Sequence, residues 1–282
     1  MTGNTLGWVI VAFVLYLLMM IAIGAFYAKG NNNSEDYFLG GRKLNGFVAA
    51  LSAQASDMSG WLLMGLPGAI YLTGVGGDGW IAIGLFIGTT LNWLFIATKL
   101  RRYTIRANNS VTLPTYFENR FHDEKKVLMA VSSITIVVFF LVYCASALSA
   151  GGQLFESVFG IDYHVALTIG ALVVLVYTFL GGFTAVCVTD FIQGMLMLVG
   201  ILAVPLFAYH FLTTGGTTLS AGLEASGADS ANFLNLMKNG DGSNNIISVI
   251  SGLGWGLGYF GMPHILVRFM AVRDEKLSLI HI

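Results

Sequence analysis

Charged residues are scarce in this chain. Of its 282 residues 10% are charged and 56% are hydrophobic, a larger apolar share than a water-soluble domain of this length can bury. The formal net charge is −1, so the chain lacks the basic surface that binds nucleic acid. The composition excludes an ordinary soluble protein and a nucleic-acid-binding one, and it indicates an all-α integral membrane protein whose solvent is the lipid bilayer.

Cysteine is almost absent as well. Cys144 and Cys187 are the only two, and both fall within apolar runs, which argues against a disulfide framework. The sequence has no Gly-x-Ser-x-Gly elbow, no cysteine or histidine cluster at metal spacing and no phosphate-binding loop. We therefore expect neither an enzyme nor an organic cofactor.

Long apolar runs are abundant instead. About 20 residues suffice to cross the hydrocarbon core of a bilayer. No basic residue precedes the first run, so we expect it to be a retained helix and not a signal peptide. About seven spanning segments are predicted, at 6–28, 46–74, 79–98, 127–157, 162–183, 189–212 and 245–271.

The loops between these segments predict the orientation. If the N-terminus lies outside, every Lys and Arg of the chain except Lys238 falls on the cytoplasmic side. Cytoplasmic loops of membrane proteins carry an excess of basic residues. We therefore expect a multi-pass protein of the cell membrane, in bacteria the inner membrane, with its N-terminus outside.

Two loops are long enough to hold short helices. On the inner side, Leu113 and Pro114 open a segment that we read either as an interfacial helix or as a solvated loop. On the outer side, residues 213–244 are rich in Gly, Ser, Asn and Asp. That loop is expected to carry one short helix at 233–237, or to form a mobile cover.

The second predicted span carries an aspartate, Asp57, near its middle. A carboxylate at the bilayer centre costs at least about 2.5 kcal/mol on insertion scales, so it normally faces a cavity and has a partner. We expect no basic residue in any span at that depth, which leaves a bound cation as the natural partner. Unwinding at the small residues of 55–60 would supply backbone oxygens as further ligands. The alternative is a protonated aspartate that holds two helices together.

Glycine is concentrated in the seventh span. Five glycines between positions 252 and 261, followed by Pro263, predict a helix that is broken near its middle. Close helix packing alone explains the glycines. It does not explain the interleaved Trp255 and Tyr259, which are expected to line a pocket for a small organic solute. Two interrupted spans, here the second and the seventh, are typical of inverted-repeat transporters, whose site lies where the two breaks meet.

Three other polar residues within the spans receive smaller roles. Tyr143 is expected either to reach the cavity or to be a buried aromatic with a hydrogen-bonded neighbour. Asp190 is expected to cap the N-terminus of the sixth span. Proton coupling through His264, next to Pro263, is considered and not favoured.

Four stretches of sequence resemble a known family. DYFLGGR at 36–42 and ASDMSGWLLMGLPG at 55–68 resemble the sodium/solute symporter family, while YCAS at 143–146 and WGLGYFG at 255–261 are similar to its sodium/proline branch. The resemblance implies a LeuT-type inverted-repeat transporter. Its parts would be an extra N-terminal helix and first cytoplasmic loop (1–45), a first repeat of five helices (46–212), an extracellular loop (213–244) and the truncated opening helix of a second repeat (245–282).

The resemblance also implies site residues, motif by motif. Ala55 and Met58 match positions whose backbone oxygens are expected to hold sodium, and Asp57 matches the associated carboxylate. Arg42 matches a cytoplasmic position linked to coupling. The residues expected between the ion and the substrate, or around the substrate itself, are Ser59, Gly60, Tyr143, Trp255, Gly256, Tyr259 and Pro263.

The function that the resemblance implies is sodium-coupled uptake of L-proline by alternating access, in which each ligand raises the affinity for the other. The alternatives are a symporter for another small organic solute and a symporter-like membrane sensor module. The hydroxyl residues that complete the family's sodium site on a later helix are missing here. We therefore expect an N-terminal fragment that does not transport by itself.

Overall fold

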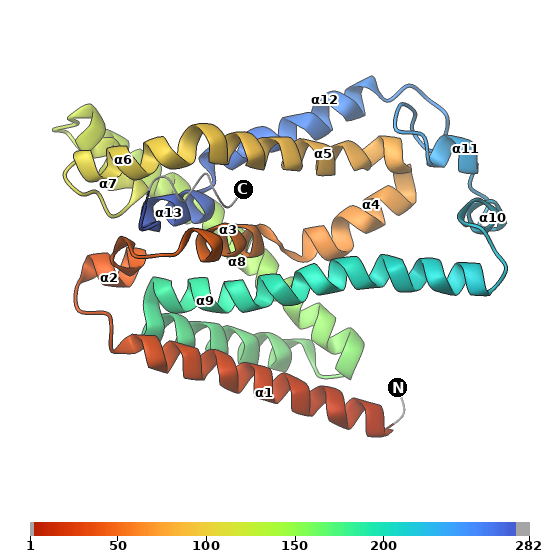
Figure 1. The fold of residues 1–282 in the computed structure, drawn as a ribbon, viewed down its shortest axis with the longest axis horizontal. Helices are drawn as coiled ribbons and strands as arrows, with labels where there is room; N and C mark the ends of the chain where they lie inside the picture. The colour runs from red at the N-terminus through yellow and green to blue at the C-terminus, as the bar shows by residue number, and fades with distance from the viewer. Residues whose placement is uncertain (1–2, 275–282) are drawn as a thin grey trace.

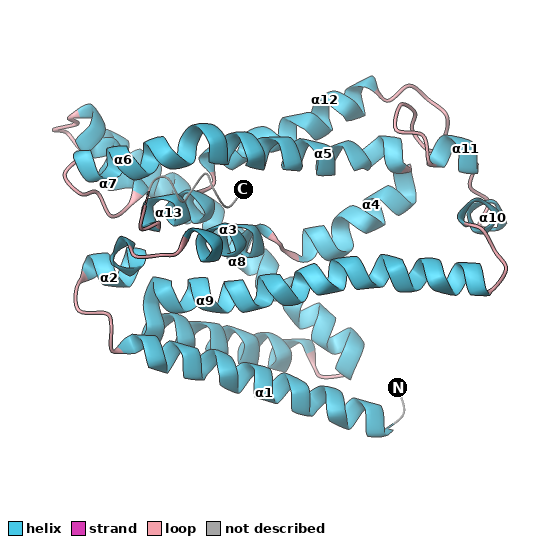
Figure 2. Cartoon of the chain, viewed as in Figure 1, coloured by secondary structure: helices cyan, strands magenta, loops and turns pink. Residues whose placement is uncertain are grey.

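The computed structural model describes residues 3–274, and Figures 1 and 2 show an assembly of helices. Within that range the backbone forms no extended strand and only two isolated bridges, Leu44 with Val272 and Lys238 with Asn244. A helix satisfies its backbone hydrogen bonds internally, as a chain inside a bilayer requires. The all-α prediction is confirmed.

The chain begins with a long apolar helix and a short connection. Helix α1 (Gly3–Ala28) is followed by α2 (Ser34–Leu39) and by one 3-10 turn, η1 (Gly40–Arg42). Asn33 begins α2, because its side chain accepts a hydrogen bond from the amide of Asp36 at 2.8 Å.

The second predicted span consists of three pieces. Helix α3 (Gly46–Asp57) ends at an extended residue, Met58, with ψ 106°. A π-helical turn, η2 (Trp61–Gly65), leads into α4 (Leu66–Thr73). The predicted interruption is therefore present, and it falls directly after Asp57.

The third and fourth spans are helical throughout and longer than predicted. Helix α5 (Val75–Asn92) continues through a π turn, η3 (Trp93–Ala97), into α6 (Thr98–Arg106). The inner loop then forms α7 (Leu113–Phe121), and α8 (Val127–Phe159) follows.

The fifth and sixth predicted spans form one continuous element, α9 (Tyr163–Thr214), with a sharp turn at Gly182. Gly182 has φ 61° and ψ −159°, a conformation open essentially to glycine alone. Figure 1 shows α9 doubling back so that both halves run beside α1. Both halves also contact α1. A Cβ placed on Gly24 would lie 2.8 Å from the carbonyl oxygen of Tyr177, and Gln193 donates a hydrogen bond to the hydroxyl of Tyr16.

The outer loop carries two short helices and not one. They are α10 (Leu219–Ala225) and α11 (Ser230–Phe233). Thr218 and Asp229 cap the N-termini of these helices. The second helix ends at Phe233, the residue at which the single predicted helix, 233–237, was expected to begin.

The seventh span is broken as predicted. Helix α12 (Ile246–Trp255) passes into a 3-10 segment, η4 (Gly256–Gly261), and α13 (Pro263–Ala271) leaves it at a bend of 47°. The helix expected to begin at Leu277, like the end of the 245–282 segment, lies outside the described residues.

Several of these helices suit a bilayer. In the described part of the chain, four are long and apolar enough to cross it, and the bent pair of α12 with α13 would make a fifth. The four are Gly7–Ala28, Val75–Arg106, Val127–Phe159 and Tyr163–Thr214. Since a helix of 52 residues far exceeds the bilayer thickness, the turn at Gly182 is what allows α9 to serve as two spans.

A buried core ties the two broken spans together at one end. Leu44 is bridged to Val272, with hydrogen bonds from the Leu44 amide to the Ala271 carbonyl (3.1 Å) and from the Arg273 amide to the Leu44 carbonyl (2.9 Å). Phe269 and Met270 are fully buried beside this bridge. The start of α3 and the end of α13 are thereby joined.

Candidate functional site

The two helix breaks meet at Asp57. Tyr259, in η4, donates a hydrogen bond from its hydroxyl to Oδ2 of Asp57, at the end of α3. Nε2 of His264, at the start of α13, lies 4.0 Å from the other carboxylate oxygen, Oδ1. The carboxylate of the first broken span therefore faces two side chains of the second.

A cavity of about 870 Å³ opens beside this contact. It lies between the α3–η2 break, α5, α8 and the α12–η4 break. Five residues singled out from the sequence line it: Asp57, Ser59, Tyr143, Trp255 and Tyr259.

Aromatic rings form part of the cavity wall. Trp61 and Trp255 stack with ring centroids 5.4 Å apart and an interplanar angle of 12°, one from each broken span. The hydroxyl of Tyr143 donates to the carbonyl oxygen of Ser56 at 3.4 Å, so Tyr143 reaches the break and is hydrogen-bonded as well. Tyr143 is therefore placed on the cavity, and since the residue is 38% exposed it is not the buried aromatic of the alternative.

The cavity combines one carboxylate with neutral polar groups. Gln54, Thr89, Thr90 and Ser146 contribute amide and hydroxyl groups, and no Lys or Arg is among the described residues that line it. A single negative charge in an otherwise neutral, partly apolar chamber suits a cation better than an anion.

Other predicted residues lie around the cavity without lining it. Ala55 is buried against Gly194 of α9, and Gly256 packs against Gly84 and Gly88 of α5. Gly60 faces Ala150 of α8.

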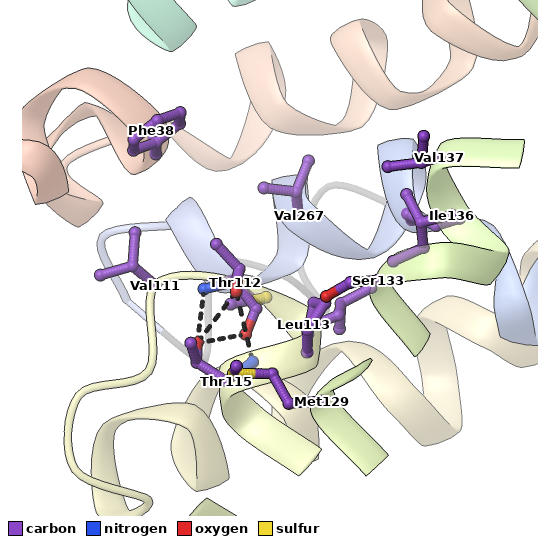
Figure 3. A pocket seen from close by; sticks show the side chains of 13 residues that line it. Phe38, Val111, Thr112, Leu113, Thr115, Met129, Ser133, Ile136, Val137 and Val267 are labelled. Carbon is purple, nitrogen blue, oxygen red and sulfur yellow. Dashed lines mark hydrogen bonds between the residues drawn. The ribbon is translucent and has the colours of Figure 1, made fainter. Parts of the chain in front are cut away.

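Pro263 lines a second, smaller cavity of about 430 Å³, shown in Figure 3. This cavity is mostly apolar and lies between α7, α8 and α13. At its edge Thr112 and Thr115 form a capping box that begins α7, with the Thr112 amide 3.1 Å from the Thr115 hydroxyl. The inner-loop segment at 113–117 is therefore a helix and not an irregular loop.

An ion pair is buried next to the α3 break. Nη2 of Arg268 lies 2.8 Å from Oδ2 of Asp190, and these residues are 5% and 8% exposed. The same carboxylate oxygen accepts hydrogen bonds from the hydroxyls of Ser52 (2.8 Å) and Ser56 (3.0 Å) on α3. Arg268 also donates from Nε to Ser52 at 3.0 Å.

This arrangement corrects one expectation. Asp190 does not cap a helix, because α9 continues through its position and its carboxylate is engaged by α3 and α13. Arg268, which the sequence placed only among the basic residues of the cytoplasmic side, is buried and pairs with Asp190. Sequence could not show this, because Arg268 lies in the last turn of the short helix α13 and reads equally well as the start of a cytoplasmic loop.

Arg42 is buried at the end of the molecule where α3 and α13 are joined. Its guanidinium donates to the carbonyl oxygens of Met270 and Ser110, both at 2.9 Å, to the Thr104 hydroxyl at 3.2 Å and to Glu35 at 3.1 Å. Burial lowers the pKa of Arg42, and the nearby Glu35 carboxylate acts in the opposite direction. Arg42 therefore connects η1 to α6, α13 and the loop before α7.

Three residues of the site were either not predicted from the sequence or were given a different role. Trp61 and Arg268 were not singled out, and His264 was considered only for proton coupling. Trp61 lies four residues after Asp57, but the break between them removes the helical spacing that would place both side chains on one face, so the sequence carried no signal for it.

A cavity at the meeting point of two broken apolar spans, with an embedded carboxylate, is the arrangement of secondary transporters. The family model of the sodium:solute symporters matches residues 37–281, which is most of the chain. The chain therefore belongs to the sodium:solute symporter family and is a multi-pass membrane protein, not an enzyme.

Curated relatives within this family are close. A sodium/proline symporter of Salmonella typhimurium is 47% identical over 272 residues, 96% of this chain and 52% of the relative. The sodium/proline symporter of Escherichia coli is 46% identical over 272 residues, which are also 96% of this chain and 52% of the relative. The high-affinity proline transporter PutP of Bacillus subtilis is 48% identical over 91% of this chain and 52% of its own. The chain thus spans about half the length of the curated relatives it matches.

A solved structure supports the fold. A sodium-coupled sialic acid symporter, in a substrate-bound outward-open state, aligns with a TM-score of 0.73 over 93% of this chain and 54% of that one, at 19% identity. The two chains share an all-helical fold over this length.

Proposed function

We propose that this chain is the N-terminal part of a sodium-coupled symporter that takes up L-proline by alternating access. One observation carries the proposal: the carboxylate of Asp57 lies where two broken spans meet and borders a cavity with aromatic walls. The relatives named sodium/proline symporter, at 46% and 47% identity, supply the solute and the cation.

Sodium binds at the end of α3. Because the last carbonyl groups of a helix have no following turn to bond, those of Ala55 and Met58 are available as hard oxygen ligands next to the Asp57 carboxylate. Further hydroxyl ligands come from a later helix of the full-length protein. Asp57 then has the cation as the partner that an intramembrane carboxylate requires.

Proline occupies the adjacent cavity. Trp255 and Tyr259 offer apolar faces to its ring, and Ser59 lines the same cavity. We propose that the chain at Ser59 and Gly60 separates the cation from the solute. Tyr143 closes the side toward α8. Gly256 and Pro263 act through the backbone, by allowing the close packing on α5 and by starting α13 after the break.

Coupling follows from this adjacency, because each ligand stabilises the same arrangement of the two breaks and so raises the affinity for the other. Arg42 takes part by holding the inner end closed through η1, α6 and α13. The sodium gradient supplies the driving force.

The remaining organisation is part of the same proposal. Residues 1–45 form an extra helix and first inner loop, 46–212 a first inverted repeat of five helices, 213–244 an outer loop and 245–282 the opening of a second repeat. About seven helices span a bacterial inner membrane, with the N-terminus outside. The positions of the breaks in α3–η2 and α12–η4 support a LeuT-type pair of repeats.

Uptake of labelled proline by membrane vesicles tests this function, with the full-length protein. We expect saturable uptake that requires an inward sodium gradient and is not displaced by unrelated organic acids. Proline uptake indifferent to sodium would contradict the coupling. Absence of proline uptake, with sodium-dependent uptake of another solute, would favour the alternative of a different substrate. No uptake of any solute would favour a membrane sensor.

A further inference from the structure

Asn92, the last residue of α5, is a fully buried polar residue to which the proposed function gives no role. It continues the face of α5 that packs against the second broken span. Four and eight residues earlier on that face, Gly88 and Gly84 approach the backbone of the span closely, as glycine allows. The next position along the face carries an amide instead, and its partner is Tyr259 in η4.

The main-chain carbonyl of Tyr259 lacks the donor that an α-helix would supply. That donor is the N–H of the residue four positions later, which here is Pro263 and has no N–H. Asn92 supplies a donor in its place, because its Nδ2 lies 2.8 Å from the Tyr259 carbonyl oxygen. A carbonyl can only accept, so the amide nitrogen is the atom that faces it. A side chain of α5 thus satisfies a backbone group that the break would leave unpaired inside the bilayer.

This hydrogen bond holds a residue of the candidate site. Tyr259 is 2% exposed, lines the larger cavity and donates from its hydroxyl to the carboxylate of Asp57. Its backbone is therefore held by α5 and its side chain by α3. Because both bonds belong to one residue, a shift of the carbonyl would move the hydroxyl away from Asp57 as well.

The other polar atom of the Asn92 side chain is unsatisfied. Its Oδ1 is buried and accepts no hydrogen bond within residues 3–274. A buried polar atom without a partner is unfavourable, and an apolar side chain of the same shape would avoid that cost. Packing alone therefore does not explain an asparagine here, and the bond from Nδ2 to Tyr259 is what the residue contributes.

We propose that Asn92 is a positioning residue of the transport site. Its amide replaces the N–H that Pro263 lacks and fixes the backbone of η4, so that the Tyr259 hydroxyl stays on Asp57. The inference rests on the proposed function, because that function places sodium at Asp57. It adds that the geometry of the cation site is set in part from α5, which lies outside both breaks.

Sodium binding by the purified full-length protein tests this inference without transport. Thermal unfolding is followed against sodium at constant ionic strength, with choline as the replacement cation, because a ligand of the native state raises the unfolding temperature. Asn92→Leu removes the amide and keeps a side chain of similar size, and Asn92→Ala replaces it if the leucine variant does not fold. Asn232→Leu is the matched control, since Asn232 bonds Asp229 in the outer loop and does not line the cavity.

We expect Asn92→Leu to raise the sodium concentration for half-maximal stabilisation about three- to tenfold, as for the loss of one neutral hydrogen bond. Asn232→Leu should stay within about twofold of wild type. In choline alone, Asn92→Leu should unfold close to the wild-type temperature, because the unpaired Oδ1 is removed together with the bond.

The Tyr259→Phe background separates positioning from packing. If Asn92 acts through the Tyr259 hydroxyl, adding Asn92→Leu to Tyr259→Phe should change the sodium concentration by less than about twofold. An equal increase with and without the hydroxyl would overturn the inference. So would a sodium concentration for Asn92→Leu equal to wild type, and a lower unfolding temperature in choline would then assign Asn92 to packing alone.

Failure of the proposed function gives a different pattern. If sodium stabilises the wild type no more than choline does, or stabilises Asp57→Asn equally, no sodium is bound at Asp57. The function and the inference that depends on it would then both be rejected. A sodium effect that is lost in Asp57→Asn and unchanged in Asn92→Leu rejects the inference alone.

Discussion

Tyr259 donates a hydrogen bond to the carboxylate of Asp57, although the two residues are 202 positions apart in the sequence. Each lies at a helix break, one after α3 and the other in the 3-10 segment η4. A side-chain contact between two interrupted spans makes their geometries interdependent. In the proposed function, this contact would couple a cation at one break to a solute at the other.

The first prediction concerns this hydrogen bond. Tyr259→Phe removes the hydroxyl and keeps the ring, so the sodium concentration for half-maximal proline uptake should rise roughly 10–100-fold, as expected for a hydrogen bond to a charged group. The matched control is Tyr163→Phe, which loses a hydroxyl bonded to Ser149 away from the cavity. An unchanged sodium dependence in Tyr259→Phe would show that the contact is dispensable.

The second prediction concerns the buried ion pair of Asp190 and Arg268. Arg268→Ala leaves the carboxylate of Asp190 buried without its ionic partner, and we expect a loss of about 3–5 kcal/mol in the free energy of unfolding. The double variant Asp190→Asn with Arg268→Ala should recover part of that loss, because no charge is then left unpaired. Equilibrium unfolding in detergent of the single and double variants measures this. Additive losses would contradict the pairing.

The third prediction concerns the glycine contact between α5 and α12. A Cβ on Gly84 would lie 2.2 Å from the carbonyl oxygen of Gly252, so Gly84→Ala should cost about 1–3 kcal/mol by overpacking. Gly254→Ala is the matched control, because a Cβ there meets nothing within 4 Å and alanine favours a helix. Thermal unfolding should separate the two variants, and equal stability would mean that the helices are not packed this closely.

The fourth prediction concerns Arg42 and the closed inner end. Arg42→Ala removes the hydrogen bonds to Met270, Ser110 and Thr104, so the core beside it should open more often. Cys187 is fully buried in that core and reports the opening through its rate of maleimide labelling, in a Cys144→Ser background. We expect labelling at least about threefold faster, and no change for the exposed Arg106→Ala. Equal labelling rates of Cys187 in wild type and Arg42→Ala would show that Arg42 does not stabilise this core.

Much of the site could be predicted from the sequence, for physical reasons. Asp57 stands out because an ionised side chain in an apolar run needs a partner, and the α12–η4 break stands out because five glycines and a proline weaken a helix. Both signals are local. The pattern of two interrupted spans predicted that the two breaks meet, and the hydrogen bond between Tyr259 and Asp57 confirms that they do.

The partners of Asp190 and Asp57 could not be predicted in the same way. Arg268 lies close to a helix end, where a basic residue is ordinarily taken as cytoplasmic, and only the bend at Pro263 turns α13 so that Arg268 meets Asp190. His264 owes its place beside Asp57 to the same bend and to stacking on Tyr143. Such distant contacts leave no spacing pattern in a single sequence. The outer loop was mispredicted for another reason: Thr218 and Asp229 are caps whose signal is weak in a polar segment.

The central claim is that the transported cation binds at Asp57, where the two broken spans meet. Initial rates of proline uptake against external sodium test it most directly, for the full-length wild type, Asp57→Asn and, as a control, Asp241→Asn on the exposed outer loop. The account predicts that Asp57→Asn loses sodium-stimulated uptake or requires at least about 100-fold more sodium, while Asp241→Asn follows the wild-type curve. Sodium-dependent uptake by Asp57→Asn with the wild-type sodium requirement would contradict it.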